Sequence, residues 1–144
     1  GLFPDEYILK FIFDDVKIEF FQANRPIQKK ILKELNYINY DNSNLKILDL
    51  KSIAKLKIVA LLQREKVRDL FDFSSMIENK ILTLDEIISI SSELKNLSSK
   101  VEFIHFLSKK KESKDDESVY LNEIDRLNLS FDEIKEKTIK LLSK

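Results

Sequence analysis

Runs of aromatic and β-branched residues occupy the start of the chain, ahead of a longer region with helical spacing. The runs at 7–13 and 16–21 are separated only by Asp14 and Asp15. Two such runs around a short polar connection predict a β-hairpin. After it, apolar residues recur at helical spacing over 26–36, which predicts a helix.

The middle of the chain alternates polar and apolar segments. Residues 37–44 are rich in Asn and Asp and predict a polar loop, and residues 45–48 predict a short strand. Asp49 or Ser52 is then placed to cap a helix that runs through the most unusual stretch of the sequence, 53–73. We expect this helix to break near Glu65 or Lys66.

The remaining sequence predicts shorter helices. Thr83 and Glu86 have the spacing of a capping box and predict a helix through residue 97, and a further helix fits 99–107. The charged, low-complexity run 109–118 predicts a flexible linker. Two more helices are expected after it, at 119–127 and 130–142, with Ser130 and Glu133 forming the cap of the second.

These elements predict an α+β protein in which a small antiparallel sheet is followed by a helical bundle. The expected parts are a β-rich segment with one helix (1–48), a helical segment (49–107), a charged linker (108–118) and C-terminal helices (119–144).

Composition narrows the function classes. Hydrophobic residues make up 43% of the 144 residues, which suffices for one packed core. The 25 basic and 25 acidic residues cancel, so any contact with nucleic acid must come from a local patch. The chain has no cysteine, and neither a membrane span nor a signal peptide is visible. We expect a cytoplasmic protein without a membrane or disulfide partner.

The stretch 53–73 places charged residues in a segment that otherwise resembles a buried helix. At about 100° per residue, Lys57, Arg64, Arg68 and Asp72 fall within roughly 80° of one another if the helix is continuous or gently bent. The same stripe carries apolar residues. A lysine in an apolar stripe needs a partner or a task.

Two interpretations of this stripe are open. In the structural one, Lys57 and Asp72 form an ion pair in the core, clamped by a neighbouring arginine. In the functional one, Lys57, Arg64 and Arg68 form a cationic comb directed at phosphates, with Asp72 and Asp69 orienting it.

The residues Lys57, Ala60, Arg64, Arg68, Asp69 and Asp72 resemble the fourth motif of the AbiEii/AbiGii nucleotidyltransferase-like family, the toxins of abortive-infection toxin–antitoxin systems. The segment DDVKIEFF from Asp14 and the segment LKILDLKSIAKLK from Leu45 resemble the strands and the helix entry that precede this motif. The likeness covers roughly residues 7–90. Where the family usually has an acidic residue before the helix, this chain has Ser52.

The resemblance implies a nucleotidyltransferase that transfers a nucleotide from an NTP to an RNA acceptor such as a tRNA end, using Mg²⁺, and that a cognate antitoxin silences. It implies catalytic roles for Lys57 and Asp72 and nucleotide or phosphate binding by Arg64, Arg68 and Asp69. Glu19, on the second strand of the expected hairpin, occupies the position where this superfamily often has a third acidic residue that binds metal. Its alternative is a solvated charge on an open strand face.

The family's Gly-Ser motif and its pair of metal-binding carboxylates have no counterpart in this chain, whose only glycine is Gly1. The sequence also starts without methionine, so we expect it to begin part-way into a gene product and to represent the C-terminal portion of such a toxin. Alone it is expected to be inactive. The alternative is a non-catalytic remnant or a protein-interaction module of the same fold.

Overall fold

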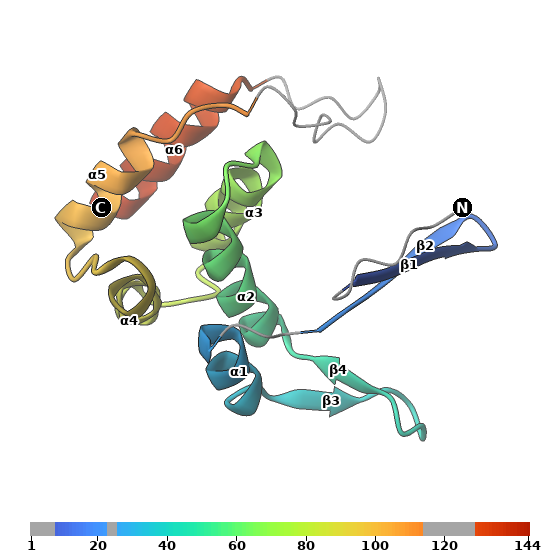
Figure 1. Cartoon of the computed structure of the whole chain (residues 1–144). Coiled ribbons are helices and arrows are strands. Elements are labelled where there is room, and N and C mark those ends of the chain that lie inside the picture. Colours follow the sequence, from blue (N-terminus) through green and yellow to red (C-terminus); the bar gives the residue numbers. More distant parts are fainter. Residues whose placement is uncertain (1–7, 23–25, 114–128) are drawn as a thin grey trace.

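The computed structural model describes residues 8–22, 26–113 and 129–144, and within them the chain is an α+β protein dominated by helices (Figure 1). The described strands all lie before residue 49, with α1 between the two hairpins, and the other described helices follow, which confirms the expected fold class. The elements are β1 (Ile8–Phe13), β2 (Val16–Phe21), α1 (Pro26–Lys33), β3 (Tyr37–Asn39), β4 (Lys46–Leu48), α2 (Leu50–Gln63), α3 (Val67–Glu78), α4 (Leu84–Lys95), α5 (Lys100–Ser108) and α6 (Phe131–Ser143).

The predicted hairpin is confirmed as β1 and β2, which pair antiparallel from Ile8 opposite Phe21 to Phe13 opposite Val16. Asp14 and Asp15 form the two-residue turn with φ values of 47° and 62°. A two-residue hairpin of type I′ needs both central residues at positive φ, because only then does the turn follow the twist of the strands. Aspartate tolerates this conformation better than most residues.

The expected loop at 37–44 is wrong in its first part, because Tyr37–Asn39 forms strand β3 and pairs antiparallel with β4. Tyr and Ile favour strands, but a three-residue strand forms only where a partner strand lies beside it. The two hairpins are also separate two-stranded sheets rather than the single small sheet that the sequence predicts.

The expected break in the long helix is confirmed between α2 and α3. Arg64 ends α2 in an extended conformation (φ −141°, ψ 164°), and Lys66 precedes α3 with φ −117° and ψ 130°. The N-cap of α2 is Asp49, whose carboxylate accepts from the Ser52 backbone N–H. Ser52 is buried and instead accepts from the backbone N–H of Asn36 at 3.2 Å.

Three of the described helices begin with a complete capping box, in which a hydroxyl accepts from the backbone N–H three residues later and a glutamate accepts from the cap's own N–H. The boxes of α4 and α6 confirm the predicted ones, and that of α5 is a third case. They are Thr83 with Glu86, Ser99 with Glu102, and Ser130 with Glu133. The helix expected at 119–127 lies outside the described residues.

The core lies among the helices. α3 packs against α2 and α6, and α4 bridges α2 and α5 (Figure 1). The side chains of Ile58, Leu61, Leu70, Phe73 and Phe103 are completely buried. Each such side chain contributes about 1.5–3 kcal/mol to folding. No helix in the described part of the chain is long and apolar enough to cross a bilayer.

Candidate functional site

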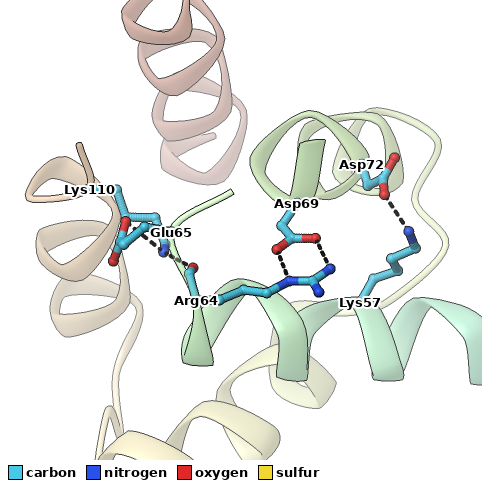
Figure 2. A network of polar contacts seen from close by, with 6 residues as sticks. All are labelled: Lys57, Arg64, Glu65, Asp69, Asp72 and Lys110. Carbon is cyan, nitrogen blue, oxygen red and sulfur yellow. Dashed lines mark hydrogen bonds and ion pairs between the residues drawn. The ribbon is translucent and has the colours of Figure 1, made fainter. Parts of the chain in front are cut away.

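The motif residues meet where α2 turns back into α3. Lys57 on α2 donates from Nζ to Oδ2 of Asp72 on α3 at 2.6 Å (Figure 2). In a continuous helix, residues fifteen apart in sequence would be separated by about 22 Å along the axis. The predicted contact is therefore confirmed, but the continuous-helix explanation for it is wrong. The reversal between the helices brings the two groups together.

Arg64, the C-cap residue of α2, makes the second contact with α3. Its Nε donates to Oδ2 of Asp69 at 2.6 Å and its Nη2 donates to Oδ1 at 2.8 Å (Figure 2). Such parallel, charge-assisted hydrogen bonds are the strong form of the arginine–carboxylate contact. Asp69 is completely buried, while the Arg64 side chain remains 47% exposed. Asp69 thus orients the guanidinium from its buried side, while part of the Arg64 side chain remains accessible to solvent.

Burial separates the two ion pairs. The side chains of Lys57 and Asp72 are 40% and 32% exposed, so they do not form the core pair of the structural interpretation. The buried carboxylate of the motif is Asp69, and its partner is an arginine. Both Asp69 oxygens accept hydrogen bonds from Arg64, so Asp69 holds the Arg64 guanidinium in a fixed orientation.

Arg68 lies on α3 one helical turn before Asp72 and is exposed. Residues four apart on a helix share a face, so Arg68 lies beside the Lys57–Asp72 pair. In the part of the chain that the structure describes, it has no ion-pair partner. The motif therefore carries three cations against two carboxylates. This composition can attract an anionic group and offers it a point charge and planar guanidinium groups.

Two residues that sequence reasoning missed complete the site, Glu65 and Lys110. Lys110 lies just after α5 and donates from Nζ to the Arg64 carbonyl oxygen at 3.1 Å and to Glu65 Oε2 at 3.4 Å (Figure 2). Its side chain is only 4% exposed. Burial lowers the pKa of Lys110, and the Glu65 carboxylate opposes that shift.

The sequence predicts a linker from residue 108, but the start of that run is anchored by Lys110. One signal for this was present. Phe103, Leu107 and Lys110 follow the spacing of one helix face, and the first two are core residues. The low-complexity character of the run hid this continuation of the buried face.

Glu19 does not combine with other ligands into a metal site. Its carboxylate contacts Lys17 at 2.9 Å and Lys10 at 3.2 Å, and these two ammonium groups lower its pKa. Among the described residues there is no group of three or more His, Asp or Glu side chains that could hold a metal ion. These residues do not fit a Mg²⁺ site.

One hollow among the described residues is lined by neither Arg64 nor Arg68. That hollow lies between α1, α2 and α4 and is lined by residues that include Ile31, Lys55 and Glu93. None of the motif residues lines it. The shared helical stripe predicts that Arg64 and Arg68 open onto one concave surface, and this stays a prediction.

Comparison with known proteins identifies no relative: no family model matches the chain, and neither a curated protein nor a solved structure matches it. The site must therefore be judged on its own residues and on the motif resemblance.

Proposed function

We propose that this chain is part of a nucleotidyltransferase-like toxin of a bacterial toxin–antitoxin or phage-defence system. The complete toxin would transfer a nucleotide from an NTP to an RNA acceptor, with tRNA as the first acceptor to test. The observation that carries the proposal is the half-exposed Lys57–Asp72 contact beside an oriented Arg64. All three groups belong to the motif that resembles the family.

In this proposal the phosphates are bound by cations held in fixed positions. Asp72 orients the Lys57 ammonium, which contacts the triphosphate as a point charge. Asp69 orients Arg64, and the neighbouring Arg68 offers a second guanidinium to phosphate or RNA backbone. Fixed donors lower the cost of reorganisation when charge develops on the transferred phosphoryl group.

A second candidate is a non-catalytic interaction module, and the burial of Asp69 favours it. A carboxylate that is completely buried and bound on both oxygens braces the α2–α3 reversal whether or not a ligand ever binds. In that case Lys57 and Arg68 are ordinary surface cations.

Phosphate binding by the purified chain separates the two candidates. We would titrate ¹⁵N-labelled protein with inorganic triphosphate and with ATP and follow backbone and arginine Nε signals by NMR. We expect shifts confined to the α2–α3 reversal, and affinity about tenfold weaker in Lys57→Met and Arg68→Ala, because a hydrogen bond to a charged group is worth about 1.5–3 kcal/mol. Lys33→Met, on the exposed face of α1, serves as the matched control.

The outcome that contradicts phosphate binding is a titration without saturating shifts at the reversal, or one that Lys33→Met weakens as much as Lys57→Met. For catalysis, a gene segment encoding a Gly-Ser strand and an acidic pair upstream of residue 1 would support the enzyme. A growth-arrest assay on that longer product should then lose toxicity in Lys57→Met while the protein stays folded.

A further inference from the structure

A chain of contacts links the C-terminal helices to the reversal that carries the motif. Lys110 Nζ lies 5.1 Å from the centre of the Phe106 ring while it donates to Arg64 and Glu65. Lys110 in turn accepts on its carbonyl oxygen from Lys135 Nζ at 3.2 Å. The buried ammonium therefore has a carbonyl, a carboxylate and an aromatic face as partners.

The atom that Lys110 contacts, the carbonyl oxygen of Arg64, lies at the start of the reversal between α2 and α3. Arg64 is held both through its backbone and through its side chain: its N–H donates to the Ala60 carbonyl, its carbonyl accepts from Lys110, and its guanidinium is held by Asp69. A carbonyl at the end of a helix has no partner within the helix. Fixing this carbonyl fixes the peptide plane that leads from α2 into α3.

We propose that Lys110 is a positioning residue for Arg64: its ammonium locks the carbonyl at the end of α2, which keeps the guanidinium in its bidentate geometry at the phosphate-binding surface. The phosphate-binding part of this statement rests on the proposed function. Lys110 does not touch the ligand surface itself, because its side chain is buried. It acts through the backbone of Arg64.

A buried lysine is an unusual means of satisfying one carbonyl, since the ammonium must lose its water. An apolar side chain of the same length would fill the space but could not donate to Arg64. Lys110→Met therefore removes the donor and keeps the volume. Lys137→Met is the matched control, because Lys137 on α6 also donates to a glutamate, Oε2 of Glu78 at 2.8 Å, and is not among the described contacts that hold Lys110 or Arg64.

The test is hydrogen exchange of the Arg64 Nε–H in the purified chain, followed by NMR at fixed pH and temperature. We expect exchange about tenfold faster in Lys110→Met, because a charge-assisted hydrogen bond that restrains the local opening is lost. Lys137→Met should leave it unchanged. A purely structural Lys110 would lower the melting temperature without this selective effect on Arg64.

Unchanged Arg64 exchange in folded Lys110→Met, or equal acceleration in Lys137→Met, would overturn the proposal. Should Lys110→Met not fold, Lys110→Gln takes its place, since the shorter amide cannot reach the Arg64 carbonyl, and the same two results decide. Triphosphate affinity is measured in parallel and should fall about tenfold in Lys110→Met. Failure of the unmodified chain to bind triphosphate would refute the proposed function alone, because the exchange result needs no ligand.

Discussion

In the β1–β2 hairpin, Phe13 and Val16 face each other across the turn with 65% and 60% of their surface exposed, whereas Phe73 and Phe103 in the helical body are completely buried. The two buried rings pack edge to face at 5.5 Å. Both regions contain aromatic residues at regular spacing. What differs is the presence of a second layer to cover them.

The β1–β2 hairpin has an alternating strand pattern but, among the described residues, no second layer packed on its apolar face. By alternation along the strands, one face of β1–β2 consists of apolar residues alone: Leu9, Phe11, Phe13, Val16, Ile18 and Phe20. The hairpin stands apart from the helices in Figure 1. A two-stranded hairpin by itself is marginally stable in water. The helical body therefore supplies most of the folding free energy of the described residues.

Truncating one phenylalanine in each region tests whether the two regions contribute differently to stability. Phe103→Ala should lower the free energy of unfolding by about 3–5 kcal/mol, because it leaves a cavity in the core. Phe13→Ala should change it by less than about 0.5 kcal/mol, since little buried surface is lost. Urea unfolding followed by circular dichroism measures both. Equal losses would mean that the hairpin is an integral part of the core.

Within the helical body, Asp69→Asn and Asp72→Asn compare a buried carboxylate with a half-exposed one on the same helix. Asp69→Asn should cost about 2 kcal/mol, because the completely buried side chain loses a charge-assisted hydrogen bond to Arg64 and its amide NH₂ faces a donor instead of an acceptor. Asp72→Asn should cost about 1 kcal/mol or less, as is typical of exposed pairs. Thermal melts provide the measurement. A large loss in Asp72→Asn would restore the interpretation of Lys57–Asp72 as a core pair.

The smallest of the three effects concerns the helix caps. Thr83→Ala removes the hydroxyl that accepts from the Glu86 backbone N–H and should cost about 1 kcal/mol. The Lys51 ammonium lowers the pKa of Glu86 most, and the Thr83 backbone N–H lowers it further. The Ser130 backbone N–H lowers the pKa of Glu133.

Because both glutamates have a lower pKa in the folded chain, their stabilising contribution is complete above the unfolded value of about 4.3 and is lost as the pH falls through the folded value. Melting temperatures between pH 7 and pH 2 should show this loss. Glu86→Gln keeps a capping side chain without the charge and should flatten the profile. An unaltered profile in Glu86→Gln would show that Lys51 and Thr83 do not lower the pKa of the Glu86 carboxyl.

The sequence predicts best where the decisive contact is local. The capping boxes at Thr83 and Ser130 are complete within four residues, so residue identity and spacing were sufficient to place the starts of α4 and α6. The Asp14–Asp15 turn is local in the same sense, since two residues that tolerate positive φ follow a strand pattern. Strand β3 is the opposite case, because its three residues become a strand only by pairing with β4.

The candidate site shows the same division between local and long-range information. The sequence by itself selected Lys57, Arg64, Asp69 and Asp72 as charged residues in an apolar context that require partners. The tertiary structure decided which partners they have: the reversal between α2 and α3 pairs Lys57 with Asp72 and Arg64 with Asp69. It also brings Lys110, 46 residues away in sequence, to the Arg64 carbonyl. A one-dimensional pattern records the need to satisfy a buried charge or carbonyl, but only the packed helices determine which distant group meets that need.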